Sequence, residues 1–193
     1  LLHRRHLDDA YSDEIYRLTT HDSLTGLYNK RYFTELLERE MRRGLRYNRV
    51  FSLIMLDIAR FKRVNVAYGY LTGDLILRQF SRRLRSIVRK EDVLVRYGDD
   101  EFVVLLPECN RSVASKTADR IQDLMVDEPF YFNATRIELN IRTAALDLNT
   151  YIESLHPQAL PHHTRNPVPA MLLEMLEDAL ENPKEPPTLD YGG

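Results

Sequence analysis

RYGDDEF, residues 96–102, is the stretch that decides the fold, and it lies between two apolar runs, VLV (93–95) and VVLL (103–106). Apolar, β-branched residues on both sides of a Gly-Asp pair are typical of two strands joined by a two-residue hairpin turn. The turn also carries three successive carboxylates, Asp99, Asp100 and Glu101, which is more than a turn requires. These acids either hold a metal ion and perform chemistry, or one of them has damaged a site that once did.

Composition limits the possible classes of protein. The 193 residues can form one sizeable core, and 44% hydrophobic with 29% charged residues is ordinary for a soluble globular protein. A formal net charge of -2 gives no electrostatic case for nucleic acid as a partner. The single cysteine, Cys109, excludes an internal disulfide and fits a reducing compartment, so we expect a cytoplasmic protein. No apolar run approaches the roughly 20 residues of a membrane span.

The first residue is Leu1 rather than methionine, and we expect the chain to be part of a longer protein with an upstream sensory domain. Residues 1–19 have weakly apolar positions at helical spacing, which predicts a signalling or linker helix. A frayed terminal helix without that role is the alternative. We expect one domain over residues 20–185 and a disordered tail over 186–193, where Pro and Gly are frequent.

Hydrophobic periodicity predicts alternating helices and strands between these ends. The predicted helices are 30–47, 74–88 (capped by Asp74), 112–126 and 170–180. The predicted strands are 51–58, 94–97, 101–106 and 136–146, and residues 153–169 are predicted to be a loop. This order indicates an α/β fold, an α+β sandwich with helices on both faces of one sheet.

Asp57 is an acid within FSLIMLDI (51–58), a run that otherwise resembles a buried central strand. A buried carboxylate is costly unless it is paired or binds a metal ion. Neighbouring strands lie about 5 Å apart, so Asp57 could meet Asp100 or Glu101 and form an all-oxygen site suited to Mg²⁺. The alternative is an Asp at a strand end that faces solvent beside a polar turn.

Four segments together resemble the GGDEF domain of the diguanylate cyclase family. They are DSLTGLYNKRYF (22–33), LIMLDIARFKRVN (53–65), GYLTGD (69–74) and RYGDDEFVVLLP (96–107). Their order and spacing agree with the family over residues 20–125, and the resemblance is weak beyond residue 130. It implies a nucleotidyl-cyclase-like mixed sheet flanked by helices. It also implies a bacterial signalling activity that joins two GTP molecules into cyclic di-GMP, each half-site being held by one subunit of a dimer.

The resemblance also implies roles for residues of the signature. The Asp57 carboxylate and the Ile58 carbonyl would bind Mg²⁺, with Asp100 as the second metal-binding acid. Glu101 would assist activation of the ribose 3′-hydroxyl, which would then attack the α-phosphate held by the partner. Lys184 matches the phosphate-binding lysine of the last helix of the family.

Other residues match the nucleotide-binding positions of the family. Asn65 and Asp74 resemble its guanine-recognition pair, an amide for the acceptor edge and a carboxylate for the donor edge. Backbone amides around Arg60, Phe61 and Lys62 would hold the phosphates of GTP, as oriented N–H groups do.

Several positions depart from the family pattern. Asp99 replaces a glycine, so the signature reads GDDEF, and its charge would lie near the triphosphate. Ala59, Val66 and Tyr70 replace Asp, Asp and His. IRTAAL (141–146) replaces a Ser-Ile-Gly-Val strand, and Pro183 interrupts the last helix directly before Lys184. These departures indicate a damaged catalytic half-site.

Arg89-Lys-Glu-Asp92 matches the RxxD inhibitory site of the family, and Arg120 falls where the family has a second arginine for that site. Arginine forks suit phosphate and guanine edges, and Asp accepts from guanine. A solvated run of surface charges is the alternative. Three histidines, His156, His162 and His163, have no acid or cysteine near them, and we expect a solvated loop rather than a metal site.

The sequence therefore predicts a degenerate GGDEF domain that acts as a cyclic di-GMP receptor through Arg89, Asp92 and Arg120. Little or no cyclase activity is expected, GTP binding is possible, and dimerisation is expected to accompany ligand binding. Two hypotheses remain beside it. One is an active cyclase that tolerates Asp99 and is inhibited by its product, and the other is a structural dimerisation domain.

Overall fold

A mixed five-stranded sheet organises the computed structural model, which describes residues 13–154 and 169–182. The strand order is β1-β3-β4-β2-β7, with β1 parallel to β3 and the other neighbours antiparallel. The strands are β1 (Tyr28–Asn29), β2 (Phe51–Ala59), β3 (Val93–Arg96), β4 (Glu101–Pro107) and β7 (Asn140–Asp147). A separate two-stranded sheet pairs β5 (Phe130–Phe132) with β6 (Thr135–Ile137).

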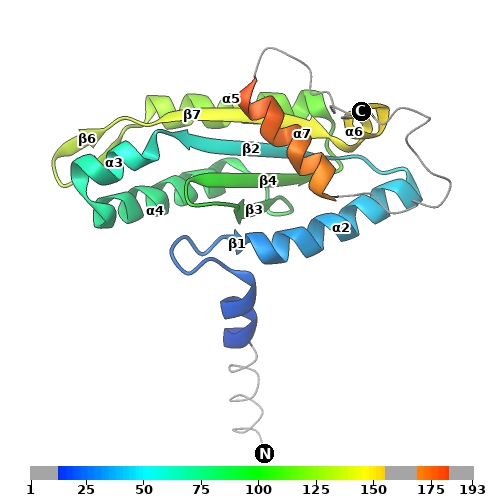
Figure 1. The fold of residues 1–193 in the computed structure, drawn as a ribbon, viewed down its shortest axis with the longest axis horizontal. Helices are drawn as coiled ribbons and strands as arrows, with labels where there is room; N and C mark the ends of the chain where they lie inside the picture. Colours follow the sequence, from blue (N-terminus) through cyan, green and yellow to red (C-terminus); the bar gives the residue numbers. More distant parts are fainter. Residues whose placement is uncertain (1–12, 155–168, 183–193) are drawn as a thin grey trace, which may run out of the picture.

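Helices cover both faces of the large sheet, as predicted (Figure 1). One face packs against α3 (Phe61–Tyr68), α4 (Tyr70–Ile87) and α5 (Arg111–Asp127). The other packs against α2 (Lys30–Tyr47), α6 (Leu148–Ser154) and α7 (Pro169–Glu181). Figure 1 shows α7 crossing in front of β2 and β7, with α4 and α5 behind the sheet.

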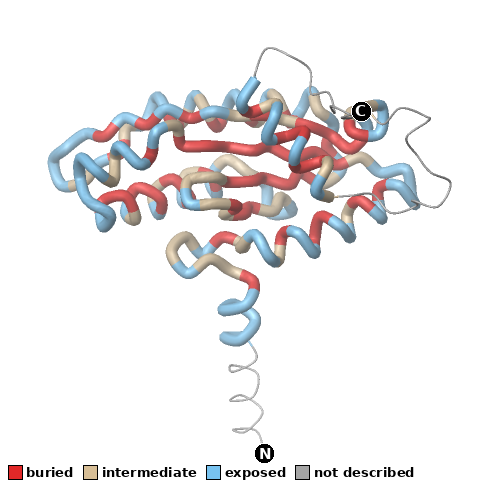
Figure 2. The backbone as a smooth tube through the Cα atoms, viewed as in Figure 1, coloured by how far each residue is buried: buried red, intermediate tan, exposed pale blue. Residues whose placement is uncertain are grey.

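Strand β2 lies inside the sheet, between β4 and β7, and this explains its continuous apolar sequence. Alternate side chains of a strand point to opposite faces. Ile54 and Leu56 accordingly join the core under α4 and α5, whereas Leu53 and Met55 join the core under α2 and α7. Figure 2 shows the strand as a buried band through the molecule. Since both faces are covered, both sets of positions are apolar.

The predicted helices are confirmed, with one change at a helix start. Asn29 caps α2 by accepting a hydrogen bond from the Tyr32 amide, and Asn110 caps α5 in the same way. The prediction that Asp74 caps its helix was wrong, because α4 begins at Tyr70, after Gly69. Asp74 lies in the second turn. A short helix, α3, precedes it and was not predicted.

Two strand predictions need correction. The segment 136–146 is not one strand, since β6 ends at Ile137 and β7 begins at Asn140. The connection between β3 and β4 is longer than a two-residue turn, because four residues, 97–100, separate the strands. The Tyr97 and Gly98 amides both donate to the Glu101 carbonyl, which closes this wider loop.

Residues 13–20 are helical, in agreement with the predicted helix before the domain. The rest of that prediction, the histidine loop, Lys184 and the predicted tail lie outside the described residues. Within the described residues, no helix is long and apolar enough to cross a membrane.

Candidate nucleotide-binding sites

The register of the sheet places three charged residues side by side at one end of β2. Asp57 is opposite Glu101 of β4 on one side and opposite Arg142 of β7 on the other. Asp57 is buried, with 8% of its surface exposed. The Arg142 guanidinium donates two hydrogen bonds to Asp57 Oδ2, from Nε at 2.9 Å and from Nη2 at 2.7 Å. The alternative of a solvent-facing Asp57 is therefore excluded.

The signature loop brings Asp100 and Glu101 to the same place. The Ile58 amide donates to the Asp100 carbonyl at 3.1 Å, which attaches the loop to the end of β2. Gly98 lies directly under the Glu101 side chain, because a Cβ at Gly98 would be 2.3 Å from Glu101 Oε2. A larger residue at Gly98 would therefore displace that carboxylate.

The clustered acids alter one another's ionisation. Burial, followed by the charge of Asp57, raises the pKa of the Asp100 carboxyl. Burial and the charges of Asp100 and Asp57 likewise raise the pKa of Glu101, while Lys30 acts in the opposite direction. Excess negative charge at this end of the sheet therefore disfavours full ionisation of the cluster.

Asp99 does not strain the backbone of the loop. The side chain is exposed, and Asp99 is not among the non-glycine residues with positive φ. Its carbonyl accepts a hydrogen bond from Arg96 Nη2 at 2.8 Å. Asp99 therefore needs no glycine-like backbone conformation, and any effect of this substitution must come from its side chain and charge.

Arg96 connects the loop to the start of the domain. Its Nη1 lies 3.2 Å from Asp22 Oδ1, while Nη2 holds the Asp99 carbonyl. Asp22 also accepts two hydrogen bonds from Thr25. Burial alone would raise the pKa of Asp22, but the Thr25 hydrogen bonds and the charge of Arg96 outweigh it, and the pKa is lowered. This ion pair stays charged down to acidic pH.

The predicted phosphate-binding amides lie at the start of α3. Arg60, directly before the helix, has a left-handed conformation with φ 61°, and no side chain caps the helix start. The first N–H groups of a helix have no intrahelical partner and favour anions. The first turn, which includes Phe61 and Lys62, therefore presents amides that a phosphate could use.

Asn65 of α3 packs against Gly73 of α4, the residue directly before Asp74. A Cβ at Gly73 would lie 1.9 Å from Asn65 Oδ1, so the amide lies directly on the backbone beside Asp74. The structure therefore places the Asn65 amide against the turn of α4 that carries Asp74. Val66 and Tyr70, which differ from the family pattern, are 80% and 77% exposed.

The resemblance to the GGDEF family implies a Mg²⁺ ion at these acids. Oxygen ligands are present in Asp57, Asp100 and Glu101, but the described residues contain no group of three or more His, Cys, Asp or Glu side chains arranged to hold one. Arg142 occupies Asp57 Oδ2 instead. Mg²⁺ requires near-octahedral oxygens at about 2.0–2.1 Å. As arranged, the site does not fit the ion.

Arg89, Asp92 and Arg120 come together at a second place, a hollow of about 280 Å³ between the end of α4 and α5. The Arg89 amide donates to Asp92 Oδ2 at 2.7 Å, which shapes the turn before β3. Burial raises the pKa of Asp92. Among the described residues, the guanidinium of neither arginine is in an ion pair.

The Arg89 turn also borders a neighbouring hollow of about 240 Å³. Arg85, Arg89 and Lys90 line it, together with backbone near Gly26. Ligand sites in proteins commonly measure about 300–1,000 Å³. Each hollow alone is slightly smaller than that range, but a dinucleotide could use both, since they share Arg89 and Asp92.

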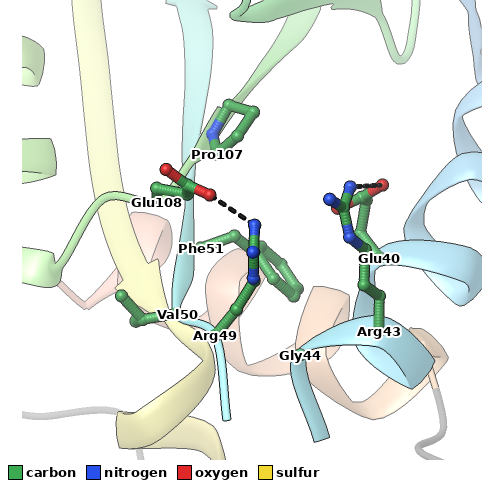
Figure 3. Close-up of a pocket in the computed structure, with 8 residues that line it drawn as sticks. All are labelled: Glu40, Arg43, Gly44, Arg49, Val50, Phe51, Pro107 and Glu108. Carbon is green, nitrogen blue, oxygen red and sulfur yellow. Dashed lines mark hydrogen bonds and ion pairs between the residues drawn. The ribbon is translucent and has the colours of Figure 1, made fainter. Parts of the chain in front are cut away.

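A third hollow lies at the opposite end of β2, beside Phe51 and Pro107 (Figure 3). Its volume is about 40 Å³, which leaves room for little more than a water molecule. Figure 3 shows Arg49 reaching Glu108 across it, with a 2.7 Å ion pair. Gly44 also lines it, and a Cβ at this position would lie 2.4 Å from the Leu148 side chain. This hollow is a packing gap far along the strand from Asp57.

Residues 19–159 match the family described as diguanylate cyclase, GGDEF domain, which is well over half of the chain. The chain belongs to this family. The response regulator PleD of Caulobacter vibrioides is 36% identical over 148 residues, which cover 77% of this chain and 33% of PleD. The diguanylate cyclase DgcP of Pseudomonas aeruginosa is 36% identical over 118 residues, 61% of this chain and 18% of DgcP. The chain thus spans a minor part of these relatives.

Solved structures agree with the fold. The coiled coil and GGDEF domain of DgcB from Caulobacter crescentus, in complex with c-di-GMP, has a TM-score of 0.76 at 21% identity and covers 95% of this chain and 94% of that one. The diguanylate cyclase SiaD of Pseudomonas aeruginosa, in complex with its activator SiaC, has a TM-score of 0.75 at 23% identity, covering 94% and 64%. At these identities the likeness shows the fold alone.

Three residues near the signature acids were missed by the sequence analysis. Arg142 is one, although its segment had been recognised as divergent. Lys30 lies 4.0 Å over the ring of Tyr97, and Glu177 of α7 lies near the Tyr97 hydroxyl. These come from three elements whose pairing is not visible in the sequence. The isolated arginine in the apolar stretch 141–146 was the one available signal.

Proposed function

We propose that this GGDEF domain acts as a cyclic di-GMP-binding receptor or regulatory module, with little or no cyclase activity. The hollow that joins Arg89, Asp92 and Arg120 carries the proposal. Cyclic di-GMP has two phosphates and two guanines, and this site offers two planar cations and one acceptor. Asp92 uses Oδ2 to hold the turn, so Oδ1 is available for a guanine N–H.

The location of the charges supports binding at this hollow. Arg89 and Arg120 are exposed, and neither forms an ion pair with another residue that the structure describes, so a ligand would have no such pair to break. Arg–phosphate contacts are strong because the fork donates two parallel hydrogen bonds. The family resemblance adds that two ligand molecules commonly stack at this site and bridge two domains. We therefore propose that binding is accompanied by dimerisation.

The opposite end of the sheet supports weak or absent turnover. Asp99 adds a negative charge beside Asp100 and Glu101, whose pKa values burial and neighbouring acids already raise. A triphosphate would add further negative charge there. Lys184, the proposed phosphate ligand of the last helix, follows Pro183 directly.

An active cyclase, which would convert two GTP into cyclic di-GMP and pyrophosphate and be inhibited by its product, is the second candidate. It is favoured by the unstrained backbone at Asp99 and by the packing of the Asn65 amide on Gly73, next to Asp74. In that case the amides around Arg60, Phe61 and Lys62 would hold the phosphates. Binding of Mg²⁺ by Asp57, the Ile58 carbonyl and Asp100 would require Arg142 to release Asp57. Glu101 would assist deprotonation of the 3′-hydroxyl.

Two measurements on the purified protein test the proposal. Calorimetry with cyclic di-GMP should give saturable heat, and light scattering should detect an increase in mass on binding. Incubation with GTP and Mg²⁺, followed by chromatography, should yield little or no cyclic di-GMP, and Asp99→Gly alone should not restore it. Turnover at about 1 s⁻¹ or faster would favour the active cyclase. Absence of heat together with absence of turnover would leave a structural dimerisation domain.

A further inference from the structure

The ion pair between Asp57 and Arg142 is built into the sheet. The two residues are direct partners in the β2–β7 register. Asp57 has 11% of its side-chain surface exposed, whereas Arg142 has 50%. A carboxylate removed from water requires a compensating charge or hydrogen bonds. Arg142 supplies both through its two contacts to Oδ2, at 2.7 and 2.9 Å.

The guanidinium also lies on the side of the sheet where the other acids are. Along β2, Leu53, Met55 and Asp57 alternate onto the face covered by α2 and α7. Glu101 and Arg142 are the direct partners of Asp57 on either side and therefore share that face. The charge of Arg142 is also felt by Asp100. One fixed positive charge thus stands among three carboxylates.

We infer that the Arg142 guanidinium takes the place of a divalent cation at Asp57, so that this half-site excludes a metal ion while the ion pair is formed. The guanidinium satisfies the buried carboxylate with hydrogen bonds that a metal ion would have to replace. A cation entering the site must therefore compete with Arg142 and also approach its positive charge. This inference does not depend on the cyclic di-GMP proposal, which concerns Arg89 and Arg120.

Binding of Mn²⁺ alone, measured by electron paramagnetic resonance, tests the inference without any turnover. The unmodified chain and the variant Arg142→Gln are titrated side by side. Arg142→Gln should bind Mn²⁺ about ten- to a hundredfold more tightly, the range expected for removing charge-assisted hydrogen bonds that compete with the ion. Adding Asp57→Asn to Arg142→Gln should abolish that gain, since the ion would then lose its carboxylate.

Arg136→Gln is the matched control. Arg136 also lies on a strand and pairs with an acid, Glu138, at 3.1 Å, but both side chains are well exposed and neither belongs to the acidic cluster. This variant should bind Mn²⁺ as the unmodified chain does. Arg142→Lys keeps a positive charge, so its Mn²⁺ affinity should also equal that of the unmodified chain.

Three results would overturn the inference. They are equal Mn²⁺ affinity of the unmodified chain and Arg142→Gln, no saturable Mn²⁺ binding by folded Arg142→Gln, and a gain of the same size in Arg136→Gln. If Arg142→Gln does not fold, thermal unfolding of the unmodified chain with and without Mn²⁺ tests the inference instead. Its melting temperature should not rise with Mn²⁺, and a saturable rise that Asp57→Asn removes would show that the ion displaces Arg142.

Discussion

Arginine side chains have different partners at the two ends of this domain. At the end of β2, Arg142 is bound to the protein's own carboxylate, Asp57, within a cluster of acids. At the hollow between α4 and α5, Arg89 and Arg120 face a space of about 280 Å³. Both regions combine arginine with aspartate. At the end of β2 the guanidinium neutralises a carboxylate of the protein itself. At the hollow the two guanidinium groups face open space that a ligand could enter.

The difference follows from what each arginine is attached to. Arg142 is on β7, the edge strand beside β2, and antiparallel pairing holds it opposite a buried acid. Arg89 is in a turn and Arg120 is on the exposed side of a helix, where no strand partner is imposed. A family signature therefore does not by itself indicate which arginines can bind a ligand. The strand or helix packed beside each arginine determines whether a carboxylate of the protein already holds it.

Among these predictions, loss of Arg89 should have the largest effect, and this effect is on cyclic di-GMP affinity. Arg89→Ala should weaken cyclic di-GMP binding about ten- to a hundredfold, because charge-assisted hydrogen bonds contribute roughly 1.5–3 kcal/mol each. Calorimetry measures the affinity. Arg82→Ala, which removes an exposed arginine of α4 outside both hollows, is the control and should bind normally. Equal binding by the Arg89 and Arg82 variants would show that the open cations are not the ligand site.

Arg96 at the signature loop is a second arginine that is bonded to groups of the protein itself. It pairs with Asp22 and holds the Asp99 carbonyl, and its side chain is only 16% exposed. Arg96→Ala should lower the free energy of unfolding by about 1–3 kcal/mol while leaving cyclic di-GMP binding unchanged. Chemical denaturation measures this. Arg49→Ala breaks the exposed pair with Glu108 and should cost less than about 1 kcal/mol. Similar losses in both variants would mean that Arg96 does not brace the loop.

The Asp22 partner makes this contribution dependent on pH. Its folded pKa is lowered, so the stabilisation is complete above the unfolded value of about 3.9 and is lost as pH falls through the lower folded value. The difference in unfolding free energy between the unmodified chain and Asp22→Asn should therefore shrink only below about pH 4. A difference that disappears nearer neutral pH would contradict the assignment.

Replacement of Asp100 should have the smallest effect on stability, and it should stabilise the fold rather than destabilise it. Burial and Asp57 raise its folded pKa, so the ionised carboxylate is unfavourable in the folded chain above that pKa. Asp100→Asn should raise the melting temperature at neutral pH by about 1–2 °C after solvent screening is allowed for. The gain should vanish at pH values below about 4, where the acid is protonated in both states. Asp119→Asn, on the exposed side of α5, should show no such gain.

The family and most of the elements follow from the sequence, whereas β1, α3, β5 and α6 were not predicted from it. The apolar run 51–58 required a strand buried on both faces, and helical spacing with Asn29 before it required α2. The short motifs placed Asp57, Asp100 and Glu101 in one site and Arg89, Asp92 and Arg120 in another. Local periodicity and motif spacing are properties of neighbouring residues, so these features can be seen in one dimension.

The contacts of these residues, in contrast, depend on the tertiary structure. The register between β2 and β7 sets Arg142 opposite Asp57, and a shift of one residue would have turned it to the other face. The same is true of Asp99, whose backbone conformation depends on the loop closed by Tyr97, Gly98 and Glu101. Strand pairing joins residues 85 positions apart in the sequence, and the packing of the whole sheet selects it. No local pattern carries that information.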